Sequence, residues 1–193
     1  MFVFSNNSII AKAYPYFKWS VYFLLFINMI LFFKTQTITE GIESLAWLVL
    51  LMLFEWETTQ LNKPYISVHE KRLVFVLKMI AYIFVVYSAY DYTTPEYIKE
   101  NGKLDMYNTI TWLLAVILIE YDVYFPGKYY RTEWIIRNIL KVILYSILFI
   151  VAVLWWIDGE FFDFYDAFLW IICFFFIELN ILKFEEEEEF EDE

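Results

Sequence analysis

Six apolar runs, separated by short polar segments, take up most of this chain and limit what it can fold into. They extend over about 17–33, 42–57, 73–90, 106–119, 139–157 and 164–182. A helix of about 20 apolar residues crosses a bilayer, and continuous rather than alternating runs favour helices over barrel strands. The second and fourth runs are short, so we expect flanking Trp and carboxylate groups at interfacial depth. The sequence predicts an all-α integral membrane protein with six transmembrane helices.

The apolar content of the chain supports a single membrane domain, 1–184, followed by an acidic cytoplasmic tail, 185–193. Hydrophobic residues make up 61% of the sequence, well above the roughly 45–50% of an average soluble domain. The tail carries eight acidic residues, and without them the net charge of −11 would be near −3. Because the acidity belongs to the tail, the composition argues against a nucleic-acid partner. The tail is either a solubilising segment or a docking segment for a basic partner.

A pattern of polar, Trp and Glu residues recurs in the second, fourth and sixth runs. The segments ESLAWLVLLMLFEWE, NTITWLLAVILIEYD and DAFLWIICFFFIELN align without a gap. Each has a polar residue, a Trp four residues later, a Glu eight residues after the Trp, and a second polar residue two positions further on. The aligned residues are Glu43, Trp47, Glu55 and Glu57 in the first segment, Asn108, Trp112, Glu120 and Asp122 in the second, and Asp166, Trp170, Glu178 and Asn180 in the third.

The first, third and fifth runs share a second pattern, Lys-x-x-x-Tyr, which places both side chains on one helix face a turn apart. The pairs are Lys18 and Tyr22, Lys78 and Tyr82, and Lys141 and Tyr145. Together the two patterns define a two-helix hairpin present three times, at about 13–62, 71–126 and 134–184. An even number of spans per unit makes the three copies parallel in the membrane. We therefore expect a pseudo-threefold bundle of three parallel hairpins around an axis normal to the bilayer.

The distribution of Lys and Arg predicts the orientation of the chain. The N-terminus, the second and fourth connections and the C-terminus hold nine Lys and Arg residues, against three in the other connections. Cytoplasmic connections of membrane proteins carry the excess of positive charge. The sequence therefore predicts a multi-pass protein with both termini in the cytoplasm.

Helical rise places the Lys and the Glu of each hairpin at the same depth, near the cytoplasmic boundary. We therefore expect three equivalent contacts, Lys18 with Glu55, Lys78 with Glu120, and Lys141 with Glu178. Two interpretations remain open: clamps that fix the register of each hairpin, or a ring that gates a pathway or coordinates an ion. The carboxylates of Glu55, Glu57, Glu120, Asp122 and Glu178 would suit a hard cation. The nearby lysines argue against tight binding of a divalent ion. The identity of any metal stays unknown.

The other repeated residues have supporting roles. We expect the three Trp residues to pack against neighbouring helices rather than line a pathway, and the three Tyr hydroxyls to bond the facing Glu or Trp. The outer polar positions, Glu43, Asn108 and Asp166, are explained either by simple solvation or by an outer ring that attracts cations. Cys173 is expected to be a small hydrophobic residue in the sixth run.

Little in the sequence supports catalysis. The one histidine, His69, lies in a predicted cytoplasmic connection, and a Gly-rich phosphate loop and a Gly-x-Ser-x-Gly motif are both absent from the sequence. Asp163 and Asp166 are expected to be solvated loop carboxylates rather than an acid and base pair. An enzyme is therefore the third function in order of preference, after two non-catalytic ones, and we expect no cofactor.

Two functions from different classes remain. The first is a small channel or transporter for cations or a small polar solute, with the repeated Lys and Glu residues near its cytoplasmic mouth. The second is a non-catalytic membrane subunit or scaffold that packs against a partner protein. The expected partners are the lipid bilayer and either another membrane protein or a second copy of the chain.

Overall fold

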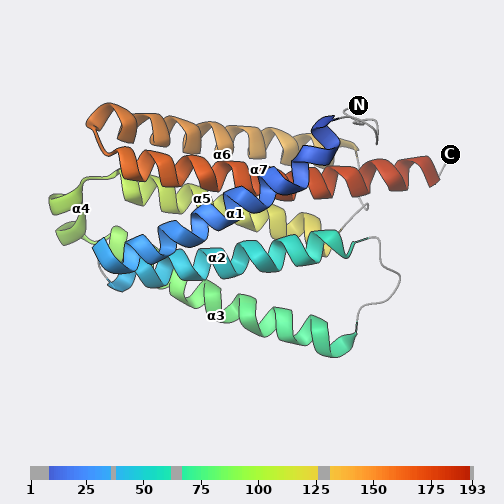
Figure 1. Cartoon of the computed structure of the whole chain (residues 1–193), viewed down its shortest axis with the longest axis horizontal. Coiled ribbons are helices and arrows are strands. Elements are labelled where there is room, and N and C mark those ends of the chain that lie inside the picture. The colour runs from blue at the N-terminus through green and yellow to red at the C-terminus, as the bar shows by residue number, and fades with distance from the viewer. Residues whose placement is uncertain (1–8, 36–37, 62–66, 126–130, 192–193) are drawn as a thin grey trace.

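The computed structural model describes residues 9–35, 38–61, 67–125 and 131–191, and these residues form seven helices. The helices are α1 (Ile9–Thr35), α2 (Ile38–Thr59), α3 (Val68–Tyr92), α4 (Pro95–Asn101), α5 (Leu104–Tyr124), α6 (Arg131–Asp158) and α7 (Phe161–Glu191). The long helices run along the long axis of the molecule, and the short α4 lies at one end (Figure 1). Both chain termini lie at the opposite end.

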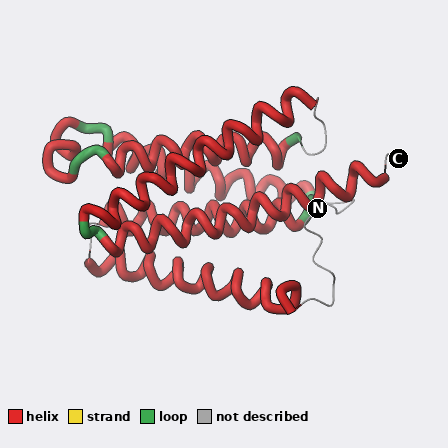
Figure 2. Tube along the Cα trace, turned by 90° about the horizontal axis from the view of Figure 1, so that it is seen from above, coloured by secondary structure: helices red, strands yellow, loops and turns green. Residues whose placement is uncertain are grey.

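The long helices form a closed bundle. Each of them packs against the next long helix in the chain, and α7 returns to pack against α1. Helix α7 also contacts α2 and α5, so these three helices meet inside the bundle. Figure 2 shows the long helices still side by side when the bundle is turned by 90°. In each of the pairs α1 with α2, α3 with α5, and α6 with α7, the second helix is therefore the more enclosed one.

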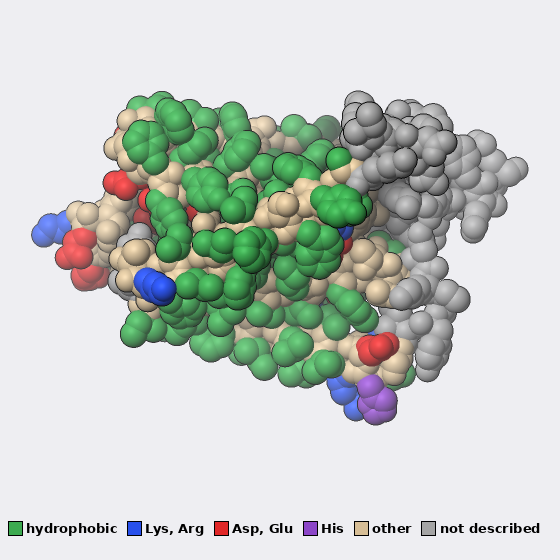
Figure 3. Space-filling model, viewed as in Figure 1, with side chains coloured by type: hydrophobic (Ala, Val, Ile, Leu, Met, Phe, Trp, Pro, Cys, Tyr) green, Lys and Arg blue, Asp and Glu red, His purple; other side chains and the backbone are tan. Residues whose placement is uncertain are grey.

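Five helices are long and apolar enough to cross a membrane: α1, α3, α5, α6 and α7. Their outer faces expose large apolar side chains, for example Phe23, Ile83 and Val142, which are 63% to 65% exposed. Hydrophobic side chains cover the middle of the face drawn in Figure 3, and charged side chains gather toward its ends. Soluble monomers rarely expose apolar surface on this scale. The composition and the surface together are those of a multi-pass membrane protein.

Helix α2 differs from the six-span expectation, because it is not among the helices whose composition suits a lipid-facing span. It carries Glu40, Glu43, Glu55 and Glu57 within 22 residues. Ionisable groups in membrane proteins face the interior rather than lipid. In keeping with this rule, α2 packs against α1, α3 and α7, and its Leu51 is fully buried. The glutamates are tolerated because neighbouring helices enclose the helix that carries them.

Two helices begin earlier than the apolar runs indicate. We expected Pro15 to precede the first span, but α1 starts at Ile9 and contains it. Proline in the second turn costs one backbone hydrogen bond, which the rest of a long helix tolerates. Helix α3 starts at Val68, so His69 lies in its first turn rather than in a connection. Ser67 and Glu70 form a capping box there, in which Ser67 Oγ accepts from the His69 N–H at 3.3 Å.

The third connection contains Pro95 and an Asn-Gly pair, which favour a turn-rich loop, but the structure places the helix α4 there. Thr94 caps this helix by accepting a hydrogen bond from the Tyr97 N–H at 3.3 Å, and Pro95 occupies the first turn. Gly102 ends it with a φ of 88°. Proline at the start and glycine just past the end are helix signals that the sequence already contained. The Pro126-Gly127 pair predicts a turn in the fourth connection, and it lies outside the described residues.

Gly159 joins α6 to α7 with a φ of 88°, and a Cβ atom there would meet no neighbour within 4 Å. The cost of a substitution is therefore confined to the backbone. We expect Gly159→Ala to lower the free energy of unfolding by about 1–2 kcal/mol, measured by thermal unfolding of the protein purified in detergent. Gly159→Asn should cost less, because Asn visits the left-handed region more readily. Equal losses for Ala and Asn would contradict this assignment.

Candidate functional site

Each repeated lysine contacts the glutamate expected for it. The Nζ to Oε distances are 2.5 Å for Lys18 and Glu55, 2.8 Å for Lys78 and Glu120, and 2.5 Å for Lys141 and Glu178. These contacts join α1 to α2, α3 to α5, and α6 to α7. The three predicted contacts therefore form, one in each of these three helix pairs.

The repeated tyrosines bind the same three glutamates. The hydroxyl to Oε distances are 2.9 Å for Tyr22 and Glu55, 2.5 Å for Tyr82 and Glu120, and 3.4 Å for Tyr145 and Glu178. Each glutamate thus has an ammonium group and a hydroxyl donor from the facing helix. Charge-assisted hydrogen bonds of this kind stabilise a carboxylate that is largely removed from water.

The second polar residue of each segment binds a different helix pair, which sequence analysis missed. Glu57 forms an ion pair with Lys78, and Asp122 forms ion pairs with Lys141 and Arg137. A step of two residues turns a helix by about 200°, so this residue faces the opposite neighbour from the preceding Glu. The spacing alone could therefore have predicted contacts between pairs as well as within them.

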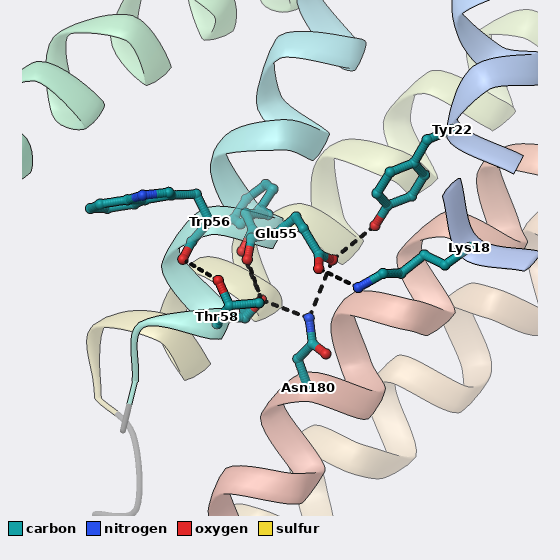
Figure 4. A network of polar contacts seen from close by, with 8 residues as sticks. Lys18, Tyr22, Glu55, Trp56, Thr58 and Asn180 are labelled. Atoms are coloured by element: carbon teal, nitrogen blue, oxygen red, sulfur yellow. Dashed lines mark hydrogen bonds and ion pairs between the residues drawn. The ribbon is translucent and has the colours of Figure 1, made fainter. Parts of the chain in front are cut away.

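The contact between the first and third helix pairs is made by a neutral amide. Asn180 Nδ2 of α7 donates to Glu55 Oε2 at 3.3 Å and to Thr58 Oγ1 at 3.1 Å. Figure 4 shows Lys18, Tyr22 and Asn180 converging on Glu55. Lys78 and Lys141 each contact two carboxylates, whereas the ion pair of Lys18 is with Glu55.

These polar groups form a layer that we call the charged belt, near the end of the bundle that carries both termini. The belt comprises Lys18, Glu55, Glu57, Lys78, Glu120, Asp122, Arg137, Lys141, Glu178 and Asn180. All five of its carboxylates contact lysine. Among the described residues no group of three or more His, Cys, Asp or Glu is placed to hold a metal ion. A metal site made of these carboxylates therefore gains no support.

A cavity of about 480 Å³ lies at the other end of the bundle, between the first turns of α2, α5 and α7 and beside α4. We call it the acidic vestibule. Its walls carry the carboxylates of Glu40, Glu43, Glu100, Asp105, Asp158, Glu160, Asp163 and Asp166. Within the part of the chain that the structure describes, no Lys, Arg or His lines it. The two ends of the bundle thus differ in the basic side chains that accompany their acidic groups: lysines in the charged belt, and none among the described lining residues of the vestibule.

The outer polar positions of the repeat, Glu43, Asn108 and Asp166, all line this vestibule. Simple solvation is the wrong explanation for Glu43, which is 8% exposed. Glu43 accepts hydrogen bonds from the Tyr92 hydroxyl and from Trp47 Nε1, the latter at 3.3 Å. Asp166 Oδ1 accepts from Asn28 Nδ2 at 3.0 Å. These partners are neutral donors, which orient a carboxylate without cancelling its charge.

Asp163 and Asp166 also differ from expectation in their location. We expected both in a solvated loop, but they lie in the first two turns of α7 and face the vestibule. Acidic groups in the first turn of a helix are favoured by its dipole. This preference explains why the loop-like stretch DGEFFDFYD becomes helical from Phe161.

The three repeated tryptophans form the floor of the vestibule. The Trp47 ring lies 6.2 Å from the Trp112 ring and 6.4 Å from the Trp170 ring, measured between centroids. Phe174 packs against Trp112 at 4.8 Å. The expected packing role is therefore present, and the same rings also line the cavity.

A layer of apolar side chains separates the vestibule from the charged belt. Leu51 and Phe54 of α2, Ile119 of α5, and Phe174 and Ile177 of α7 are all fully buried. Their positions between the Trp and Glu residues follow from the repeat itself. The cavity therefore ends on packed side chains before it reaches the belt.

Helix α4 forms part of the mouth of the vestibule. The Tyr97 hydroxyl donates to Asp105 Oδ2 at 3.2 Å, and the Tyr97 ring lies 4.8 Å from the Tyr92 ring. Burial, with the nearby Asp105 carboxylate, raises the pKa of the Tyr97 hydroxyl well above its ordinary value. Tyr97 therefore stays protonated and remains a donor to Asp105.

Sequence analysis found part of the vestibule and missed the rest. The repeat singles out Glu43, Asn108 and Asp166, but it contains no signal for the carboxylates of the connections and of α4. Acidic residues cluster near the start of α2, α5 and α7, and these three starts adjoin in the bundle. No protein-family model, curated protein or solved structure matches this chain.

Proposed function

We propose that this chain is a small membrane transporter or channel for cations, and that the acidic vestibule is where the cation enters. The observation that supports this proposal most directly is the contrast between the acidic groups at the two ends of the bundle. Eight carboxylates line the vestibule with no Lys, Arg or His among the described lining residues, whereas every carboxylate of the charged belt contacts a lysine. A cleft lined by charge of one sign, with walls of low dielectric constant, concentrates counter-ions.

The proposed architecture is three parallel hairpins, α1 with α2, α3 with α5, and α6 with α7, around a pseudo-threefold axis. It is supported by the equivalent Lys, Glu and Tyr contacts in the three pairs. The excess of positive charge near the termini and the second and fourth connections supports a cytoplasmic location for both termini. On this orientation the vestibule faces the outer side, and the charged belt lies near the cytoplasmic mouth.

Movement of a cation requires the apolar layer and the belt to rearrange. The fully buried side chains of Leu51, Ile119 and Ile177 close the path below the tryptophans. A transporter alternates between states that open to one side at a time, and a channel opens a path through both layers. The belt is the proposed inner gate, because its ion pairs must exchange partners for a cation to pass.

The alternative is a non-catalytic membrane subunit or scaffold. The observation that favours it is the same closed layer, because a sealed core with fully paired charges also suits a rigid structural part. On this view the exposed aromatic side chains of the outer helices pack against a partner membrane protein. Flux measurements separate the two functions.

Reconstitution into liposomes tests the proposal. We expect K⁺ uptake above that of empty vesicles, and we expect the double variant Glu43→Gln with Asp166→Asn to lose about tenfold or more, because both carboxylates line the vestibule. The matched control is Glu96→Gln, an exposed carboxylate of α4 outside the cavity lining. If the unaltered protein gives no flux above empty vesicles with K⁺ or with methylammonium, the transport function is wrong and the scaffold function remains.

A further inference from the structure

We propose that the cation taken up by the acidic vestibule is an organic ammonium ion with N–H groups, held over the three-tryptophan floor. This inference rests on the proposed function, because it names the class of cation for the same site. It is argued from the size of the cavity, the aromatic floor and the acceptors on the wall.

The cavity does not have the geometry of a site for Mg²⁺ or Ca²⁺. Mg²⁺ and Ca²⁺ are held by several oxygen ligands that converge on one point. Among the described residues no three acidic, His or Cys side chains converge in this way. The volume of about 480 Å³ instead falls in the range of about 300–1,000 Å³ that is typical of pockets for small organic molecules.

The floor supplies the aromatic surface that organic ammonium ions bind. Trp47, Trp112 and Trp170 all line the cavity, and each is less than 10% exposed. An ammonium group within about 6 Å of a ring centroid is attracted to the ring face, and Trp is the most effective ring. The interaction strengthens when the cation is removed from water, as it would be at this depth.

The wall above the floor offers hydrogen-bond acceptors to N–H groups. Asn108 lines the cavity, and its Oδ1 atom is fully buried with no hydrogen-bond partner among the described residues. Glu43 is more than nine-tenths buried, and its carboxylate oxygens accept hydrogen bonds from the neutral donors Tyr92 and Trp47. A buried acceptor without a partner is costly, so a turn of the Asn108 side chain that brings Oδ1 to a ligand N–H would remove that cost. This arrangement favours an ammonium with N–H groups over a quaternary one.

Isothermal titration calorimetry of the full chain in detergent tests the inference. The probes are methylammonium, tetramethylammonium, K⁺ and Mg²⁺, each as its chloride. We expect methylammonium to bind at least tenfold more tightly than K⁺ or Mg²⁺, and more tightly than tetramethylammonium. Trp112→Leu should weaken methylammonium binding at least tenfold and weaken K⁺ binding by a smaller factor. The control is Trp19→Leu, whose exposed side chain lies outside the cavity lining.

Two further variants keep the test decisive if Trp112→Leu does not fold. Trp112→Phe keeps an aromatic ring in the core and should give an intermediate loss, and Asn108→Leu should remove the preference for methylammonium over tetramethylammonium. K⁺ binding as tight as methylammonium, unaffected by these changes, would overturn the organic-ammonium inference and leave cation uptake standing. If none of the four probes binds and liposomes show no flux, the proposed function itself is wrong.

Discussion

Lys78→Met is expected to be the most damaging single substitution in the charged belt. The Lys78 side chain is 3% exposed and contacts the carboxylates of both Glu57 and Glu120. Without the ammonium group, two acidic groups would remain close together in a largely dehydrated site. Removal of one partner of a buried ion pair costs about 3–5 kcal/mol. We expect a loss of this size in thermal unfolding of the protein purified in detergent, with a sharp fall in the yield of folded protein.

Three comparison variants define what this result would mean. Lys99→Met, at an exposed position of α4, should change stability little. Lys18→Met should cost less than Lys78→Met, because its partner Glu55 keeps hydrogen bonds from Tyr22 and Asn180. Adding Glu57→Gln and Glu120→Gln to Lys78→Met should restore much of the stability. If Lys78→Met unfolds at the same temperature as Lys99→Met, the belt does not hold the helix pairs together.

Phe174→Ala is expected to have the second large effect, because it removes a ring from the layer that closes the vestibule. Phe174 is fully buried and contacts the rings of Trp47, Trp112, Trp170 and Phe54. Truncation of a buried Phe costs about 3–5 kcal/mol, part of it from the cavity that is left. We expect that loss in thermal unfolding.

The same substitution also tests the closed layer. The lost ring enlarges the vestibule toward the belt, so liposomes that contain Phe174→Ala should leak K⁺ faster than those with the unaltered protein. The adjacent Phe175 is 55% exposed and points away from the core, which makes Phe175→Ala the matched control. Equal stability of the two variants would contradict the assignment of Phe174 to a closed layer.

The belt was largely predictable from sequence, because it depends on local periodicity. Lys18 and Tyr22 fall on one helix face by spacing alone, and helical rise puts Glu55 at the same depth on the returning helix. The partner of Glu57 needed one more step, the rotation of about 200° between residues two apart. That step identifies the neighbouring helix pair only once the order of pairs around the bundle is known.

The vestibule was not predictable in the same way. It is built from the starts of α2, α5 and α7 and from α4, which come together only through the packing of helices far apart in sequence. The apolar run within α2 also gave no sign of its different status, which comes from the four glutamates on either side of that run. Burial of Glu43 among Tyr92 and Trp47 depends on the enclosure of α2 by neighbouring helices.

The two kinds of belt contact have a consequence for how the chain is made. Membrane helices emerge from the ribosome in order, so the ion pair of Lys18 with Glu55 can form as soon as α2 follows α1. Glu57 can form its ion pair only after the second helix pair, which carries Lys78, has been made. Asp122 likewise needs Lys141 of the third pair. Each newly made pair is thus attracted to the one before it. Asn180 of the third pair binds a glutamate that is already neutralised by its own lysine, so the third pair joins the first without an unmatched charge at that joint.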